Sequence, residues 1–262
     1  MKTIKAKTIY DYLRIVSILS GGGTVLWYRG SSSLKYGLVP SLYWRKQARW
    51  ERNFVHKFLV RYRAYVRESI SNPWEIYALM RHHGLPTRLL DWSRSPLTAL
   101  FFALTQEPDR DADRVVWILP PYHLNKYTLG TESIFCPAGM ASRSVRLGKK
   151  RQLDLDAYLP KALDPSDNYK LPLKPIAIES PLSIPRIAAQ QGCFTLHGSS
   201  QRGLELQFTR RAAPFLSAVI LKTKGNHDAF MEPLLSWGVN EETIYQDLDS
   251  MTRNILRTEG IS

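Results

Sequence analysis

Hydrophobic positions along this chain alternate between helical and strand spacing, with no internal repeat. Apolar residues at helical spacing begin at Tyr10 and stop at the glycine triplet at 21–23, which predicts an N-terminal helix within residues 1–22. The next residues, 24–30, are rich in strand formers and predict a short strand. Large aromatic residues then recur at every fourth position, which predicts one long helix over 44–67.

Two N-cap residues followed by proline predict the next pair of helices. An Asn-Pro pair at 72–73 and a Ser-Pro pair at 95–96 place Pro in a first helical turn, where its missing N–H costs nothing. We therefore expect helices over 73–83 and 96–106, the second apolar on most sides and hence buried. The polar residues between them, 87–94, predict a loop.

The remainder predicts a sheet and a helical tail. Residues 114–120 are typical of a central strand, and further short strands are expected at 176–180, 194–198, 204–208 and 215–221. Two helices around Gly238 are expected over 231–256, whereas residues 122–175 give no clear pattern. The fold class that these elements predict is α+β, a small mixed or antiparallel sheet flanked by helices, in a single domain over 1–262.

Composition narrows the class of protein. The chain has 262 residues, of which 44% are hydrophobic, enough for one ordinary globular core. Thirty-six Lys and Arg against 23 Asp and Glu give a formal charge of +13, which favours nucleic acid, nucleotides or acidic protein surfaces as partners. Two distant cysteines predict neither a disulfide framework nor a zinc knuckle. Because no disulfide is expected, we expect a reducing, cytoplasmic location. No membrane partner is expected, because no apolar stretch approaches the roughly 18 residues of a membrane span.

Positive charge is concentrated in one segment. Residues 44–67 hold eight Lys and Arg against Glu51 alone, so a net charge of +7 lies there. Such a helix is often only a solvated face, but this excess also predicts contact with a polyanion. The candidate nucleic-acid-binding residues are Arg45, Arg49, Arg52 and Lys57.

The block 81–103 carries the candidate chemistry, together with Trp-Tyr-Arg-Gly at 27–30. It places two histidines, a glycine, arginines, an aspartate and a tryptophan directly before an apolar helix, which is typical of a ligand site. His82 and His83 with Asp91 would suit acid–base cleavage of a phosphodiester, but adjacent helical residues point about 100° apart and do not enter one site together. Too few ligands cluster for zinc, so no metal is expected.

Four segments carry a resemblance to a known family. In chain order they are WYRGSSSLKYGLVPSLYWR, MRHHGLPTRLLDWSRSPLTALFFAL, PRIAAQQGCFTLHG and WGVNEETIYQDLD. Together they resemble the FRG domain, a bacterial and phage family named for its aromatic-Arg-Gly signature, with a family core over 27–249. The resemblance implies a toxin or phage-defence setting, in the bacterial cytoplasm or in the host cytoplasm if the protein is phage-encoded.

A weaker resemblance, to arginine-type ADP-ribosyltransferases, implies a site. Arg29 matches the strand arginine that holds the phosphate or ribose of NAD. Asp91, Ser93 and the helix that follows match the element that supports the nicotinamide pocket. Gln190 or Gln191, before a glycine and an aromatic, matches the residue over the ribose, although those transferases usually have Glu there. The fold implied is ADP-ribosyltransferase-like, with NAD as co-substrate and no tightly bound cofactor.

The candidate residues follow from that resemblance and from the loop. The catalytic candidates are Arg29, Arg88, Asp91, Gln190 and Gln191. The candidates for binding the nucleotide are Arg29, Gly30, His83, Thr87, Trp92, Ser93 and Phe194.

Other interpretations of the same residues stay open. Arg88 and Asp91 would also suit a salt bridge that fixes the loop. His83 would suit a helix C-cap and Trp92 a core position. The same groups would equally suit a regulatory module that binds a nucleotide or a protein partner, such as an antitoxin, without catalysis.

Overall fold

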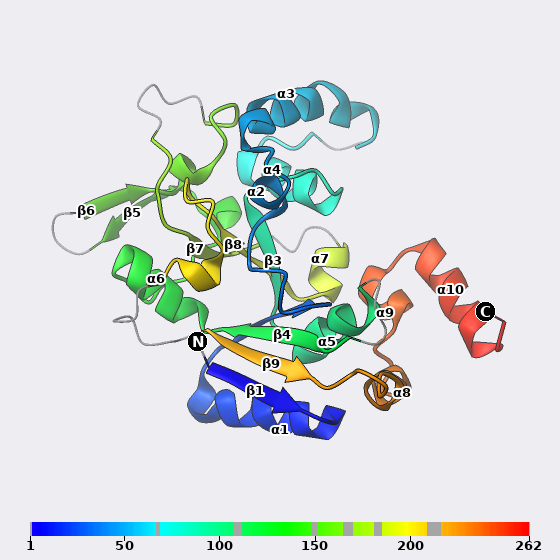
Figure 1. Cartoon of the computed structure of the whole chain (residues 1–262). Helices are drawn as coiled ribbons and strands as arrows, with labels where there is room; N and C mark the ends of the chain where they lie inside the picture. Colours follow the sequence, from blue (N-terminus) through cyan, green and yellow to red (C-terminus); the bar gives the residue numbers. More distant parts are fainter. Residues whose placement is uncertain are drawn as a thin grey trace.

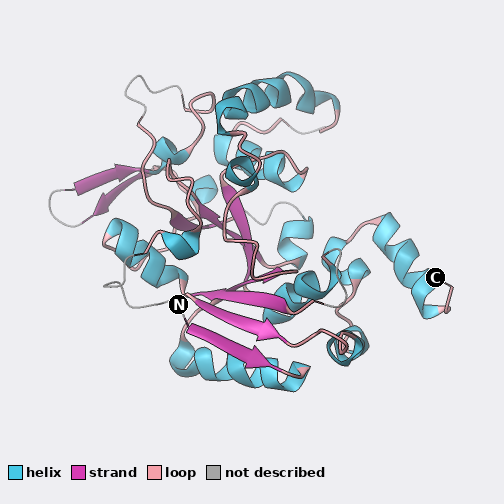
Figure 2. Ribbon diagram, viewed as in Figure 1, coloured by secondary structure: helices cyan, strands magenta, loops and turns pink. Residues whose placement is uncertain are grey.

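The computed structural model describes residues 2–66, 69–106, 112–147, 151–164, 170–180, 185–208 and 216–261. The strands of the main sheet lie in the middle of the molecule with helices around them, and a separate two-stranded pair projects at one side (Figure 2). Within these described residues the main sheet has seven strands in the order β1-β9-β4-β2-β3-β8-β7, in which the neighbours β1 and β9 are parallel and the other neighbouring pairs are antiparallel. The expected class, a mixed sheet flanked by helices, is confirmed, with more strands than a small sheet would have.

The strands are β1 (Lys2–Ala6), β2 (Trp27–Ser31), β3 (Leu89–Ser93), β4 (Arg114–Leu119), β5 (Ser144–Leu147), β6 (Arg151–Asp154), β7 (Ile176–Glu179), β8 (Gly192–Leu196) and β9 (Ser217–Leu221). The helices are α1 (Ile9–Leu19), α2 (Ser41–Trp44), α3 (Glu51–Arg61), α4 (Pro73–His82), α5 (Pro96–Thr105), α6 (Pro121–Leu129), α7 (Pro185–Ala189), α8 (Asp228–Ser236), α9 (Glu241–Tyr245) and α10 (Leu248–Thr258). No helix in the described part of the chain is both long and apolar enough to span a bilayer.

The main sheet is split near its centre. Strand β2 pairs with β4 along its whole length, but it meets β3 at one residue pair, Tyr28 with Ser93. Strand β3 then continues with β8 and β7. In Figure 1, β3 runs steeply across the view, whereas β4, β9 and β1 lie nearly level. The sheet therefore has two parts that diverge from the Tyr28–Ser93 junction.

Helix α5 fixes β2 at this junction. The Ser95 side chain caps the helix by accepting from the Thr98 N–H at 3.2 Å, as the Ser-Pro pair predicts. The helix is buried against β2, and a Cβ added to Gly30 would lie 2.0 Å from the Ala99 carbonyl oxygen. Glycine is therefore required at this position for the strand and the helix to approach so closely.

The N-terminal prediction is wrong in its first residues. Residues 2–6 form β1, which pairs in register with β9, and α1 begins only at Ile9. Thr8 sets that start through a capping box with Asp11. The strand was missed because its stability comes from pairing with a segment more than 200 residues away in sequence.

The long basic helix is broken into shorter pieces. Lys46 adopts a left-handed φ of 56° and ends the short helix α2, and turns of 3-10 helix precede and follow α3. Its aromatic stripe is only partly internal, since Tyr62 is buried but Trp50 is 44% exposed. Residue 67, the predicted end, lies outside the described residues.

The polar loop expected at 87–94 is also wrong, because residues 89–93 form β3. Backbone pairing with β8 stabilises this strand, and the local sequence does not indicate that pairing. The strand expected at 204–208 is wrong as well: residues 204–206 form a 3-10 turn whose first N–H, on Leu204, bonds the carbonyl of Leu38.

The other predicted elements are close to the structure. Strands β4, β7, β8 and β9 lie within the predicted ranges or overlap them, and α4 and α5 match the two cap-plus-proline helices. The tail has three helices rather than two, with Gly238 in a left-handed turn after α8. The region without a pattern holds α6 and the hairpin of β5 and β6.

Candidate functional site

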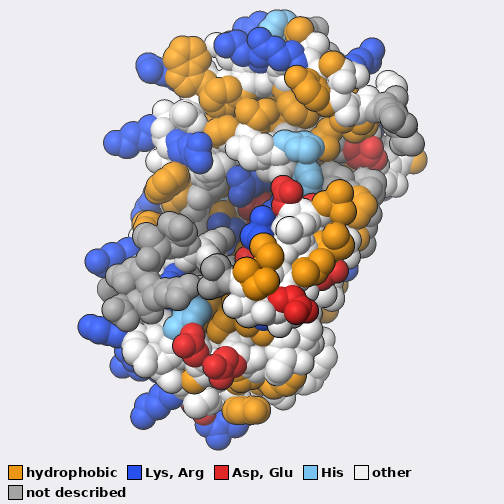
Figure 3. Space-filling model, turned by 90° about the vertical axis from the view of Figure 1, so that its right-hand side faces the viewer, with side chains coloured by type: hydrophobic (Ala, Val, Ile, Leu, Met, Phe, Trp, Pro, Cys, Tyr) orange, Lys and Arg blue, Asp and Glu red, His pale blue; other side chains and the backbone are white. Residues whose placement is uncertain are grey.

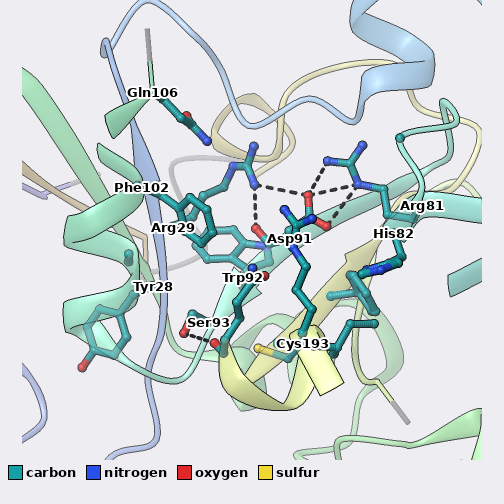
Figure 4. A pocket seen from close by; sticks show the side chains of 18 residues that line it. Tyr28, Arg29, Arg81, His82, Asp91, Trp92, Ser93, Phe102, Gln106 and Cys193 are labelled. Carbon is teal, nitrogen blue, oxygen red and sulfur yellow. Dashed lines mark hydrogen bonds and ion pairs between the residues drawn. The ribbon is translucent and has the colours of Figure 1, made fainter. Parts of the chain in front are cut away.

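A cavity of about 300 Å³ lies where the two parts of the sheet diverge (Figure 4). Its lining residues come from strands β2, β3 and β8, from helices α4, α5 and α7, and from the residues just after these helices. The residues that line it are Tyr28, Arg29, Gly30, Arg81, His82, Gly84, Asp91, Trp92, Ser93, Ala99, Phe102, Gln106, Arg186, Ile187, Gln190, Gly192, Cys193 and Phe194. The volume lies at the lower end of the range for small-molecule sites.

Asp91 lies at the centre of the polar wall, between two arginines that approach it from either side (Figure 4). Arg81, in the last turn of α4, donates from Nε to both carboxylate oxygens at 3.1 Å. Arg29 donates from Nη1 to the backbone oxygen of Asp91 at 2.7 Å, and the same nitrogen is 3.7 Å from Oδ2. The Arg29 side chain thus bridges β2 and β3 where backbone pairing between them stops.

These charges favour an anionic ligand. Burial alone would raise the pKa of Asp91, but Arg81 and then Arg29 outweigh it and hold that pKa below its usual range. Burial, the neighbouring His83 and Arg186 lower the pKa of His82, which is therefore neutral at pH 7. Among the lining residues, three arginines against one aspartate leave a net charge of +2.

Arg186, on α7, is the lining cation that is most available. It is half-buried and its guanidinium lies 4.5 Å from the centroid of the Tyr245 ring. It forms no salt bridge with any residue that the structure describes. An anion that enters the cavity could bind the Arg186 guanidinium without first displacing a carboxylate from it.

Hydrogen bonds of Ser93 and Gln190 connect several of the elements that line the cavity. Ser93 Oγ donates to the Gln190 carbonyl at 2.6 Å and accepts from the Ser95 N–H at 2.9 Å, so it links β3, α5 and the turn before β8. The Gln190 side chain donates from Nε2 to the Ile244 carbonyl at 3.2 Å. That bond fixes the amide and leaves Oε1 as an acceptor.

Seven of the residues predicted from sequence line this cavity: Arg29, Gly30, Asp91, Trp92, Ser93, Gln190 and Phe194. Trp92 does so with an indole that is only 3% exposed and whose Nε1 donates to Thr195 Oγ1 at 3.0 Å. Its environment is therefore that of a core side chain, which was the alternative interpretation.

Arg88 lies elsewhere. It is 1% exposed, and its Nε donates to Glu51 Oε1 at 2.8 Å while Nη1 donates to the His197 carbonyl at 3.1 Å. The salt bridge between Arg88 and Asp91, which was the alternative interpretation, is therefore wrong: Asp91 pairs with Arg81 and Arg29, and Arg88 pairs with Glu51. Arg88 instead joins α3 to the start of β3.

The remaining predicted residues are also not among those that line the cavity. Thr87 is buried, and its Oγ1 accepts from the Leu89 N–H at 3.3 Å. His83 is exposed at the C-cap of α4, with its ring against that of His82. Gln191 is exposed with a left-handed φ of 49°, and its carbonyl accepts from the Arg94 N–H.

Sequence reasoning missed Arg81, Arg186 and Phe102 as lining residues. Arg81 gave no local signal, because its partner lies ten residues away on a strand that was predicted as loop. Arg186 stands four residues before Gln190, a spacing that places two side chains on one helical face, and this signal was available.

The basic residues Arg45, Arg49, Arg52 and Lys57 lie outside the cavity, all exposed on α2, α3 and the turn between them. No group of three His, Cys, Asp or Glu side chains in the described part of the chain is arranged to hold a metal ion.

These observations define a mixed α and β fold with a polar cavity beside an aromatic-Arg-Gly strand. The family model of the FRG domain matches residues 24–112, so this segment is similar to the FRG domain. The matched segment includes Arg29, Arg81, Asp91 and Phe102, whereas the wall from Arg186 to Phe194 follows it in the chain. Comparison with curated proteins and with solved structures gave no match.

Proposed function

We propose that the cavity binds NAD and that the protein transfers ADP-ribose to an acceptor, with release of nicotinamide. One observation carries the proposal: three segments far apart in sequence that resemble ADP-ribosyltransferase elements, at 27–30, 91–103 and 190–194, all contribute to one cavity. No single segment resembles those enzymes closely, but convergence of all three on one small volume is not required by the fold alone.

The charges suit the diphosphate of NAD. Arg186 is free of salt bridges to described residues, and Arg29 uses Nη1 for Asp91 while its other N–H groups have no hydrogen bond to a described residue. Two guanidinium groups with spare donors can bind a diphosphate in the forked geometry that arginine favours. Phe102 and Phe194 supply aromatic surface for the nicotinamide ring.

The chemistry breaks one bond and forms one. The C–N bond between ribose and nicotinamide breaks, its electron pair stays with nicotinamide, and the ribose carbon gains positive charge. An acceptor atom then bonds to that carbon and loses a proton. Gln190 Oε1 is an acceptor for a ribose hydroxyl, which orients the sugar.

Asp91 and His82 have different parts in this proposal. Asp91 is the one carboxylate among the lining residues and is held ionised by Arg81 and Arg29, so it positions Arg29 rather than taking up a proton. His82 is neutral at pH 7 because burial lowers its pKa, and a neutral imidazole can accept the proton that the acceptor loses. The setting that the family resemblance implies is cytoplasmic toxin or phage-defence activity.

The test is turnover of NAD that carries a labelled nicotinamide ring. The wild-type protein should release the label, and NAD should raise its melting temperature, because a ligand that binds only the folded state stabilises it. Arg29→Ala should lose both effects. Arg14→Ala, a matched change at an exposed arginine of α1, should keep both.

The outcomes separate the competing functions. A rise in melting temperature with NAD but no release of nicotinamide would mean that the protein binds NAD as a non-catalytic regulatory module and does not transfer ADP-ribose. Neither a shift nor release in the wild-type protein would refute the proposal.

A further inference from the structure

One end of the molecule carries an exposed surface of positive and aromatic side chains, which we call the basic–aromatic surface. Figure 3 shows Lys and Arg side chains gathered with hydrophobic ones over the upper end of the molecule, where Figure 1 places α3. The surface consists of Arg45, Lys46, Arg49, Arg52, Lys57, Arg61 and Arg63 with Trp44, Trp50 and Tyr65, all of them exposed.

The positive charge of this surface is not compensated. Glu51 is the one acid in residues 41–66, and it faces inward, where it accepts from Arg88 Nε at 2.8 Å and from the Tyr77 hydroxyl at 2.7 Å. None of the seven cations forms a salt bridge with an acid in the part of the chain that the structure describes. The seven cations therefore repel one another, and a bound polyanion would relieve this repulsion.

The exposed aromatic residues indicate which kind of polyanion would fit this surface. Trp44, Trp50 and Tyr65 are 64%, 44% and 86% exposed, although large aromatic side chains are usually buried to a much greater extent. The Arg49 guanidinium lies 5.2 Å from the centroid of the Trp50 ring, so charge and ring form one platform.

The exposed cations of α3 are spread along and around the helix. Arg52, Lys57 and Arg61 extend over about 14 Å of its axis at 1.5 Å per residue, with Arg52 on the opposite flank from Lys57 and Arg61 at about 100° per residue. Exposed cations beside exposed rings are the combination with which proteins hold single strands, since phosphates meet the cations and unpaired bases stack on the rings.

We propose that the basic–aromatic surface binds single-stranded nucleic acid. In a duplex the bases are already stacked on one another and offer no free face to Trp44 or Trp50. An acidic protein would neutralise the cations but would have no specific use for the exposed rings.

The surface begins next to the cavity. Ser41, the first residue of α2, accepts a hydrogen bond from the cavity arginine Arg81 at 3.2 Å, and Trp44 follows three residues later. A strand bound here would lie on the element that supports one cavity wall. Binding itself needs no NAD, so its test is independent of the reaction proposed for the cavity.

The experiment measures fluorescence anisotropy of a labelled single-stranded oligonucleotide of about 12 nucleotides, within the usual site sizes, at several salt concentrations. Affinity should fall as salt rises, with a log–log slope of about −0.7 for each phosphate contacted. The variant Arg49→Glu/Arg52→Glu/Lys57→Glu should bind at least about tenfold more weakly and with a shallower slope. Trp50→Ala should bind about tenfold more weakly with little change in slope.

A matched variant controls for net charge. Lys5→Glu/Lys7→Glu/Lys224→Glu makes the same change in charge at exposed positions near β1 and β9, at the opposite end of the molecule from α3 (Figure 1). It should bind nearly as well as the wild-type protein. Melting curves of all variants verify folding, and single reversals at Arg52 and Lys57 replace the triple variant if it does not fold.

Three results would overturn the proposal. Equal weakening by the two triple variants would mean that overall charge, not this surface, binds the strand. Equal affinity for a duplex, with no effect of Trp50→Ala, would remove the role of unpaired bases. Binding of polyglutamate without binding of the oligonucleotide would assign the surface to an acidic protein.

Discussion

Replacement of Gly30 by alanine tests the packing that defines the cavity. The added Cβ would lie 2.0 Å from the Ala99 carbonyl oxygen and 2.4 Å from the Ala103 nitrogen, both backbone atoms of α5. No side-chain rotation relieves these contacts, so β2 and α5 must move apart. Overpacking typically costs 1–3 kcal/mol, and a clash with helix backbone places this change near the upper end, at about 3 kcal/mol.

The expected result is a large fall in thermal stability. A loss of about 3 kcal/mol in a chain of this size lowers the melting temperature by roughly 6–12 °C, at about 2–4 °C per kcal/mol. Circular dichroism melts and urea titrations measure both quantities. The NAD-induced melting shift should vanish as well, because Arg29 and Phe102 lie on the two elements that separate.

Gly21→Ala is the matched control. Nothing lies within 4 Å of its added Cβ, and its φ is not in the left-handed region. Alanine there should leave stability unchanged or raise it slightly, by restricting the unfolded chain. Equal melting temperatures for the two variants would refute the close approach of β2 and α5.

Three further changes test ionisable side chains of the cavity and the core. Glu51→Gln leaves the Arg88 guanidinium buried without its carboxylate and should cost about 3–5 kcal/mol in urea unfolding, whereas Glu132→Gln, in an exposed pair with Lys126, should change the free energy of unfolding far less. A small loss of unfolding free energy in Glu51→Gln would mean that the buried ion pair of Glu51 and Arg88 adds little stability. Asp91→Asn should lower the melting temperature at neutral pH, and the difference from wild type should disappear as pH falls below 3.8 through the lowered pKa of Asp91; a difference that persists in acid would contradict the ion pair. His197 is buried with no ring partner among the described residues and a pKa lowered to about 3, so the wild-type protein loses stability as pH falls from 6.5 toward 3, and His197→Phe should lose less over that range. Identical pH profiles would exclude a neutral buried histidine.

Local signals in the sequence predicted the helices around the site. Asn72 and Ser95 each accept from a backbone N–H of the first turn, and Pro follows each of them, so both helix starts are encoded within four residues. The aromatic-Arg-Gly strand was recognisable because residues 24–30 are rich in strand formers. Arg29, Asp91, Ser93 and Gln190 could therefore be assigned to one site before their contacts were known.

Features that depend on distant pairing could not be predicted. Residues 89–93 form a strand only because β8, about 100 residues later, pairs with them. As long as residues 89–93 were predicted to be a loop, nothing in the sequence indicated that Arg81 contacts Asp91, ten residues later. The partner of Arg88 was unpredictable for a similar reason, since Glu51 reaches it from α3, 37 residues earlier.

The single pairing of Tyr28 with Ser93 has a consequence for the energetics of the whole chain. Backbone hydrogen bonds couple strands within each part of the sheet, but across the junction the coupling rests largely on the Arg29 side chain and on α5. The two parts can therefore open as separate cooperative units, each with its own free energy of opening. A molecule that contacts both Arg29 and Phe194 would couple those units, and amide protons of β7, a strand that contributes no lining residue to the cavity, would then exchange more slowly with solvent.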